Sequence, residues 1–361
     1  MQNIELKLDQ VFSSLSNQFD IVPLDVADCP VFLAVSLPSN DSNTGLLPRL
    51  PSGKGLSLQQ ALMSAAGEAV ELRASLAQNL ERKRFVFENR DGIDFVFAKN
   101  LHDNCGEFFP AQSVFLDYAF VYKEQLLFEA DSNGCAAGLT YDGALSAALL
   151  ECIERDALAI WWYGKQSRGH LPLSILDSVE PRLSWWLGTR HRLTMLIDVR
   201  SDVGIPVVVA ASSEADGTLV AMGSAAATNI HAAAVSAVTE MVQMEVSIHT
   251  GKLQDNSSLT MWLAHATARG MQQFMPSETV ATFSGGDDLN IFDLMRNLNF
   301  RVFAINLTQS SDVLHTVRVI VPDFCAMGRK FSAKRILHSN GLNPHYNGAL
   351  SVSDFETLEP Y

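Results

Sequence analysis

The stretch ALSAALLECIERDALAIWW (residues 144–162) carries the sequence pattern that is most informative about the fold. Apolar residues occupy nearly every side of the helix that it predicts, so this helix is expected to be buried all round. Four charged residues nevertheless lie within it: Glu151, Glu154, Arg155 and Asp156. A buried charge costs free energy unless it is paired or bound to a metal ion. The stretch therefore predicts an ion network or a ligand site in the interior of the fold.

A second helix with two glutamates three residues apart is predicted over residues 58–83. Ser57 and Gln60 have the S-x-x-Q spacing of a capping box, which marks the N-terminus of that helix. At about 100° per residue, one face of the helix carries four polar side chains. These are Ser64, Glu68, Glu71 and Ser75.

Two interpretations of the paired glutamates are open. In the first, the two helices pack together and gather four carboxylates and an arginine, which Mg²⁺ would neutralise while bridging them to substrate phosphates. In the second, the glutamates form structural ion pairs with Arg73 and Arg155. A di-iron bundle is excluded, because it needs Glu-x-x-His and no histidine stands three residues after any of these glutamates.

The segment DSNGCAAG, residues 131–138, directly precedes the buried helix. Its small residues would let backbone N–H groups approach an anion, and the following helix N-terminus favours negative charge. An ordinary turn that starts a helix accounts equally for the same residues. The segment GKGLS, residues 53–57, is no P-loop, because Pro48 and Gly55 stand where Walker A needs glycine and Ser or Thr.

Composition and patterning indicate a mixed α/β (α+β) protein in which mixed sheets pack with long helices, without a P-loop or Rossmann fold. Of the 361 residues 47% are hydrophobic and 18% charged, which is typical of chains that form a core. Strands are predicted over 31–37, 113–122, 126–130, 193–199, 205–212, 218–223 and 316–321, and further helices over 1–22 and 230–249. Residues 284–288 are predicted to form a turn. Residues 1–50 are expected to form an N-terminal extension, a helix plus a strand that pack on the main domain of residues 51–361, which the family resemblance described below implies to be catalytic.

The net charge and the positions of the cysteines and histidines argue against several classes of protein function. A net charge of −14 argues against nucleic-acid binding, and neither a membrane-spanning stretch nor a signal sequence is apparent, so the expected location is the cytoplasm. The cysteines lack any C-x-x-C pair and the nine histidines are scattered, which disfavours disulfides and transition-metal sites. The five cysteines are expected to be reduced structural side chains: Cys29, Cys105, Cys135, Cys152 and Cys325.

Taken together, these segments resemble the YcaO family over residues 52–324. The resemblance is carried by six stretches in order: GKGLSLQQALMSAAGEAVELR, DSNGCAAGLT, ALSAALLECIERDALAIWW, LIDVRSDVGIPVVVA, MGSAAATNIHAAAVSAVTEMVQ and TVRVIVPD. Each stretch alone is a weak signal, and their order makes the resemblance specific.

The resemblance implies that the chain binds ATP and Mg²⁺. It assigns metal and phosphate binding to Glu68, Glu71, Glu151 and Glu154. It assigns ATP binding to Lys54, Ser64, Ser132, Asn133, Ala137, Gly138, Arg155, Glu240 and Gln243. No catalytic residue is assigned.

The activity implied is phosphorylation of peptide backbone amides, most simply to convert Cys, Ser or Thr of a ribosomally made precursor peptide, such as a bacteriocin, into thiazoline or oxazoline. The implied partners are the precursor peptide, an E1-like or leader-peptide-binding protein, a flavin-dependent azoline dehydrogenase and a second copy of the chain. A thioamide-forming or accessory member of the family and a non-catalytic scaffold are the alternatives.

Three departures from the family pattern bear on the reaction. Leu72 stands where the family has an arginine after the second glutamate, and Arg73 follows one place later. Ser236 replaces an arginine often found four residues before Glu240. The sequence ends FETLEPY, in which Pro360 is the single proline, where azoline-forming members commonly have a Pro-x-Pro-x-Pro tail.

Overall fold

The computed structural model describes residues 10–15, 19–39, 50–103, 105–165, 167–250, 257–277, 290–325, 327 and 335–336. The chain divides into two compact units. The first unit comprises residues 1–27, 32–152 and 295–322, and the second comprises residues 28–31, 153–294 and 323–361. Helices and antiparallel sheets are mixed throughout, which confirms the predicted mixed α/β class.

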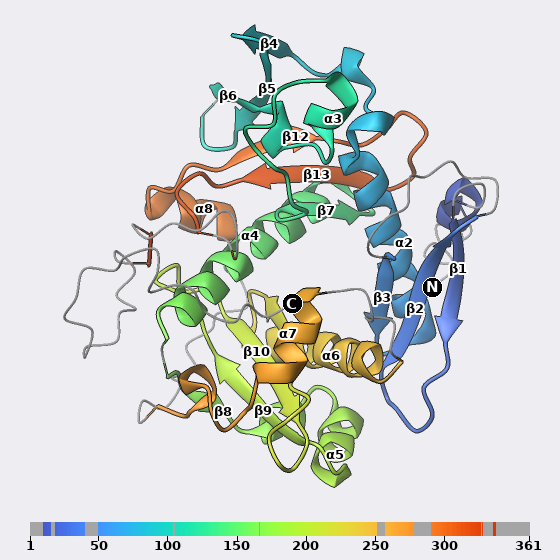
Figure 1. The fold of residues 1–361 in the computed structure, drawn as a ribbon, viewed down its shortest axis with the longest axis vertical. Helices are drawn as coiled ribbons and strands as arrows, with labels where there is room; N and C mark the ends of the chain where they lie inside the picture. Colours follow the sequence, from blue (N-terminus) through green and yellow to red (C-terminus); the bar gives the residue numbers. More distant parts are fainter. Residues whose placement is uncertain are drawn as a thin grey trace. The chain divides into compact units, whose positions relative to one another are not determined.

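The first unit contains a small antiparallel sheet in the order β1-β2-β3, formed by Phe19–Leu24, Phe32–Pro38 and Ser52–Gly55. Helix α2 (Leu58–Ser75) packs on this sheet (Figure 1). The helix and the strand lie so close together that a Cβ atom at Gly53 would overlap backbone atoms of Ala61 and Ala65. Glycine at position 53 therefore sets how near α2 lies to strand β3.

The predicted start of α2 is confirmed by its capping contacts. The Ser57 hydroxyl accepts a hydrogen bond from the Gln60 N–H at 3.3 Å, and the Gln60 side chain accepts one from the Leu56 N–H at 2.8 Å. The helix ends at Ser75 rather than at residue 83, because Leu76 adopts an extended conformation with φ −73° and ψ 125°. Apolar residues after Ser75 therefore do not continue the helix.

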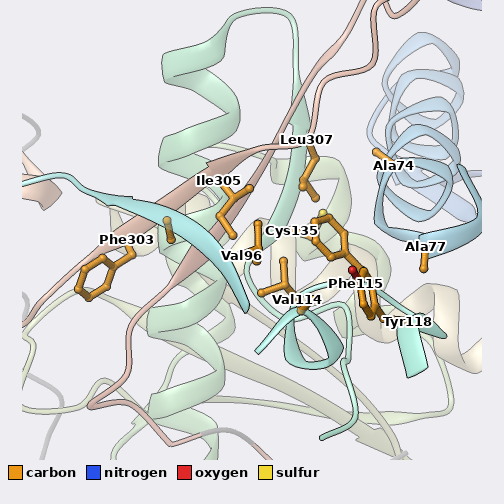
Figure 2. Packing of buried hydrophobic residues seen from close by; sticks show 12 residues of the cluster. Ala74, Ala77, Val96, Val114, Phe115, Tyr118, Cys135, Phe303, Ile305 and Leu307 are labelled. Carbon is orange, nitrogen blue, oxygen red and sulfur yellow. The ribbon is translucent and has the colours of Figure 1, made fainter. Parts of the chain in front are cut away.

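The larger sheet of the first unit has the order β4-β5-β12-β13-β7, with β6 paired to β5. These strands are Phe87–Arg90, Ile93–Asn100, Phe303–Asn306, His315–Ile320, Cys135–Gly138 and, for β6, Gly106–Pro110. Figure 2 shows the core beside this sheet, where Val96, Phe115 and Phe303 pack with Ala74 of α2 and Cys135 of β7. Each fully buried large apolar side chain contributes roughly 1.5–3 kcal/mol, so this core fixes α2 against β7.

The second unit is built on an antiparallel sheet in the order β11-β10-β9-β8, formed by Ala221–Ala226, Val207–Ser213, Leu193–Asp198 and His170–Leu171. Every residue of β10 is buried. Helix α6 (Ile230–His249) packs on β10 and β11 and is capped by Asn229, whose side chain accepts from two backbone N–H groups. Helices α5 (Pro181–Thr189) and α7 (Ser257–His265) also lie in this unit, and α8 (Ile291–Asn297) precedes β12.

Helix α4 (Tyr141–Tyr163) contains the charged and otherwise apolar stretch 144–162. Most of its apolar residues are buried as predicted, and Trp161 and Trp162 are fully inaccessible, but Ala147 is exposed and Leu150 and Cys152 are half-buried. The residues up to Cys152 belong to the first unit, and those from Ile153 belong to the second.

Two segments predicted as strands do not form them. Residues 113–122 contain the end of a 3₁₀ helix (Ala111–Ser113), a turn and helix α3 (Tyr118–Tyr122), and residues 126–130 have no regular structure. Asp117 and Lys123 flank α3 in the left-handed conformation, with φ near 59° and 57°. The aromatic residues here alternate like a strand, yet Phe115, Tyr118 and Ala119 are buried at helical spacing.

The predicted helix over residues 1–22 is also corrected, since residues 10–15 are helical and strand β1 begins at Phe19. The strands predicted over residues 31–37, 193–199, 205–212, 218–223 and 316–321 and the helix over 230–249 are found within a few residues of those limits. The predicted turn at 284–288 lies outside the described residues. The division at residue 50 stays a prediction.

Candidate ATP and magnesium site

In the first unit, the side chain of Glu71 links helix α2 to strand β7. The Ala137 N–H donates a hydrogen bond to Glu71 Oε1 at 2.7 Å. This contact uses a backbone donor of the segment 131–138, which the sequence analysis singled out as a candidate anion site. The Ala137 N–H of this segment therefore binds the side chain of Glu71.

Two glutamates, Glu68 and Glu151, act on Glu71 in this part of the first unit. The pKa of Glu71 is raised to about 8, mainly by burial and also by the charges of Glu151 and Glu68, while the hydrogen bond from the Ala137 N–H opposes the rise. Glu68 is exposed and accepts a hydrogen bond from the Ser52 N–H at the start of β3. The two helices that each carry a Glu-x-x-Glu pair therefore bring Glu68, Glu71 and Glu151 close enough to interact.

This donor set fits Mg²⁺ bound together with a nucleotide. Carboxylate oxygens are the ligands that Mg²⁺ prefers, and Mg²⁺ is usually held by one or two carboxylates plus substrate phosphates rather than by a complete protein cage. Within the part of the chain that the structure describes, no three His, Cys, Asp or Glu side chains form a metal site on their own. The mutual repulsion felt at Glu71 would be relieved by a cation.

The turn before β7 is fixed by a buried arginine of strand β13. Arg318 donates to the Asp131 carbonyl at 2.7 Å and to Asp131 Oδ1 at 3.3 Å. Asp131 in turn accepts hydrogen bonds from the backbone and side-chain nitrogens of Asn133. Gly134 has φ +73°, and a Cβ atom there would contact the Val319 oxygen. The turn is therefore held rigidly at one edge of the sheet.

The second unit contains a separate group of predicted site residues. Ser224 of β11 donates a hydrogen bond to Glu154 Oε1 at 2.6 Å. A Cβ atom at the neighbouring Gly223 would overlap backbone atoms of α6 at Ala237 and Met241 and would lie 2.7 Å from the Glu240 carbonyl carbon. Strand β11 and helix α6 thus lie close together beside Glu154, at the level of Glu240.

The remaining predicted residues occupy defined places. Lys54 lies in β3 opposite Leu33 and is half-buried. The half-buried residues also include Ser64, Asn133, Ala137, Gly138, Arg155 and Gln243, whereas Ser132 is exposed. Arg73, which could have paired with Glu68 or Glu71, forms a buried ion pair with Asp312. Their roles toward ATP and Mg²⁺ stay predictions.

Asp156 has a structural role that the sequence did not reveal. Its carboxylate is fully buried in α4 and accepts hydrogen bonds from the Arg335 guanidinium at 2.6–3.1 Å and from the Cys325 N–H at 2.9 Å. Asp202 binds the other side of Arg335 at 2.7 Å. The two carboxylates raise the pKa of Arg335, so this network satisfies one of the four charges on the helix.

Three further residues of the site were missed from the sequence: Ser52, Ser224 and Arg318. Ser52 contributes a backbone N–H, which any residue supplies, so no sequence signal marks it. Ser224 follows the helix-contacting Gly223, and Arg318 is the one charged residue within the apolar run TVRVIV. A charged residue inside an otherwise buried strand was the signal available for Arg318.

The sequence profile described as YcaO cyclodehydratase, ATP- and Mg²⁺-binding, matches residues 74–325. The chain belongs to the YcaO family. This match confirms the predicted family, and it confirms ATP and Mg²⁺ as the ligands of that family. In the described part of this YcaO chain, no helix is long and apolar enough to cross a bilayer.

Several known proteins are similar to this YcaO chain. An uncharacterized protein of Methanothermobacter thermautotrophicus is 26% identical over 347 residues, covering 84% of this chain and 88% of the relative. The YcaO of Methanopyrus kandleri, solved with AMPPCP and Mg²⁺, has a TM-score of 0.70 at 19% identity and covers 90% of both chains.

A heterocyclase solved in complex with substrate and cofactor has a TM-score of 0.77 at 19% identity and covers 91% of this chain. This YcaO chain spans 54% of that heterocyclase chain. At these identities the structural likeness shows the shared fold.

Proposed function

We propose that this protein uses ATP and Mg²⁺ to activate backbone amides of a peptide, and that it forms azolines from Cys, Ser or Thr residues. The observation that carries the proposal is the group of Glu68, Glu71 and Glu151, in which the charges of Glu68 and Glu151 help to raise the pKa of Glu71. Such a group requires a cation to be fully ionised at neutral pH. Membership of a family described as ATP- and Mg²⁺-binding supplies the ligand class.

The residues of the first unit would act mainly by position and charge. Glu71 is oriented by the Ala137 N–H and Glu68 by the Ser52 N–H, so both carboxylates are held before any ligand arrives. Together with Glu151 they would hold Mg²⁺, which when bound neutralises the triphosphate. Preorganised charges of this kind are the main contribution that proteins make to phosphoryl transfer.

The proposed chemistry explains why ATP is consumed. A thiol or hydroxyl of the peptide adds to the preceding amide carbon and gives a tetrahedral adduct. The adduct oxygen takes the γ-phosphoryl group of ATP and then leaves as phosphate, because phosphate is a far better leaving group than hydroxide. The net change is one water removed from the peptide for each ATP converted to ADP and phosphate.

Partners are part of the proposal. The precursor peptide is the substrate, and an E1-like or leader-peptide-binding protein would present it. A flavin-dependent dehydrogenase would oxidise the azoline, and the chain would act as a homodimer. This chain spans 54% of the heterocyclase chain that was solved with substrate and cofactor, and in this proposal a partner protein would supply the peptide-binding role.

Mg-ATP binding tests the site. We expect Glu71→Gln and Glu151→Gln to weaken Mg-ATP binding, measured by calorimetry, by at least about tenfold. Glu71→Gln keeps an acceptor for the Ala137 N–H, so the fold should be retained. Glu88→Gln is the matched control, since Glu88 is an exposed glutamate of β4. Equal binding by all four proteins would contradict the proposed site.

Incubation with precursor peptide, partner protein and ATP tests the reaction. Loss of one water per heterocycle, with release of one phosphate, is the expected result. A gain of sulfur in place of oxygen would instead show a thioamide-forming enzyme. Tight Mg-ATP binding without any peptide product would show a scaffold role, which Leu72 and Ser236 would help to explain.

A further inference from the structure

We infer that Arg318 of strand β13 is a positioning residue for nucleotide binding, which acts through the turn of residues 131–134 that precedes β7. Ser132 and Asn133 of this turn are among the residues to which the family resemblance assigns ATP binding. The inference therefore rests on the proposed function. It adds a residue to which that resemblance gives no role.

The buried guanidinium of Arg318 is directed at a single residue of the turn. Arg318 is 2% exposed. One terminal nitrogen donates to the Asp131 carbonyl at 2.7 Å, and the other donates to Asp131 Oδ1 at 3.3 Å. The Nε atom is buried without a hydrogen bond in the described part of the chain. Asp131 is thus the residue that Arg318 holds.

Stability does not explain an arginine at this place in the sheet. The adjacent residues of β13, Val317 and Val319, are buried and apolar, and Arg318 lies opposite Ile305 and Cys135 in the flanking strands. Replacing a buried charged pair by apolar residues of similar volume is often neutral or stabilising, whereas a guanidinium fork fixes the direction of its partner. The contribution of Arg318 is therefore geometric.

The Asp131 carboxylate passes this fixed direction on to Asn133. Its Oδ1 atom accepts from the Asn133 backbone N–H at 3.1 Å, and its Oδ2 atom accepts from Asn133 Nδ2 at 3.0 Å. Because an ionised carboxylate accepts hydrogen bonds and donates none, it selects the nitrogen end of the Asn133 amide. The half-buried Asn133 side chain is thereby held in one orientation, with its oxygen turned away from Asp131.

The other end of the turn is held by the residue that follows Arg318. The Val319 N–H donates to the Gly134 carbonyl at 2.7 Å. A Cβ atom at Gly134 would lie 2.5 Å from the Val319 oxygen and 2.6 Å from Cys152 Sγ, so the turn cannot move closer to β13 or α4. Two successive residues of β13 therefore fix both ends of the turn. Placement of this kind prepares binding groups before a ligand arrives.

The position of the Asn133 amide can be measured without a ligand. Its side-chain NH₂ signals in the nuclear magnetic resonance spectrum of the full-length protein are assigned by their absence in Asn133→Ala. Arg318→Met removes the donors to Asp131 and should shift these signals. Arg82→Met is the matched control and should not shift them, because Arg82 pairs with Asp94 of the same unit at 2.6 Å. Unchanged Asn133 signals in Arg318→Met would overturn the proposal.

Calorimetry with Mg-ATP measures the consequence for binding. Arg318→Met should weaken Mg-ATP binding by about 10–100-fold, as the loss of a residue that orients a ligand-binding group commonly does. Arg318→Lys keeps the charge but loses the fork, so its affinity should fall between the two. Most of the Arg318→Met effect should disappear in Asn133→Ala protein, because the two residues act through one turn. Arg82→Met should bind as the natural protein does.

Folding and the proposed function are separated by the same measurements. Arg318→Met should unfold near the temperature of the natural protein, and Arg318→Lys carries the comparison if the apolar variant does not fold. Equal Mg-ATP affinity of the natural protein and the folded Arg318 variants, or full additivity with Asn133→Ala, would overturn this inference and leave the proposed function standing. A natural protein that does not bind Mg-ATP would contradict the proposed function and this inference with it.

Discussion

The Ala137 N–H and the Glu71 carboxylate are joined by a 2.7 Å hydrogen bond that links strand β7 to helix α2. The bond stabilises the ionised form of Glu71, whereas burial and two neighbouring glutamates stabilise the protonated form. Burial and the two glutamates outweigh the hydrogen bond, so the pKa of Glu71 is about 8 and its protonated form predominates at neutral pH. This residue is therefore poised to exchange a proton for a cation.

A first prediction concerns the pH dependence of stability in metal-free protein. A carboxyl whose pKa is raised on folding, here from 4.5 to about 8, binds more protons in the folded state. Its contribution to stability is fully present below pH 4.5 and is lost as the pH rises through 8. Urea unfolding in EDTA between pH 5 and 9 should show stability falling with pH more steeply than in Glu71→Gln. Parallel pH profiles for the two proteins would contradict the raised pKa.

The second prediction concerns the contact between β3 and α2. Gly53→Ala should destabilise the protein by about 1–3 kcal/mol, because its Cβ atom would overlap backbone atoms that cannot move aside. Gly67→Ala, within helix α2, should stabilise the protein by up to about 1 kcal/mol, since a Cβ atom there meets nothing within 4 Å. Denaturant unfolding of the two variants measures both effects. A loss of stability in both would show that the contact at Gly53 is not special.

The third prediction concerns the buried ion network of α4. Asp156→Asn removes one of the two negative charges that neutralise the buried Arg335, and it should lower the free energy of unfolding by about 3–5 kcal/mol. Glu107→Gln, which removes an exposed ion pair with Arg301, should cost about 1 kcal/mol or less. Thermal unfolding would reveal the difference. Similar losses in both variants would argue that the Asp156 network contributes no more than a surface pair.

The fourth prediction concerns thiol reactivity. Cys105 is exposed, whereas burial and the charge of Glu71 raise the pKa of the buried Cys135 to about 12. Iodoacetamide at pH 8 should therefore modify Cys105 quickly and leave Cys135 unmodified until the protein unfolds, as peptide mass mapping would show. Rapid modification of Cys135 in the native protein would contradict its placement in the core.

The strands of residues 87–110 show a signal that the sequence analysis did not use. Asp91 and Gly92 both have positive φ, at 51° and 86°, and join β4 to β5. An Asp-Gly pair between alternating apolar residues is the strongest short-range sign of a hairpin. The helix α3 is different, because its aromatic spacing fits a strand and a helix alike and the left-handed residues that bound it are not evident from sequence.

The sequence by itself determined the helices that carry Glu68, Glu71, Glu151 and Glu154, the capped start of the first of these helices and the family, because periodicity, capping and ordered motifs are local features of the chain. Only the tertiary structure decided which charges meet. It paired Asp156 with Arg335, Arg73 with Asp312 and Glu154 with Ser224. These partners are 70 to 239 residues apart, and their pairing depends on how buried surfaces pack, which no local pattern encodes.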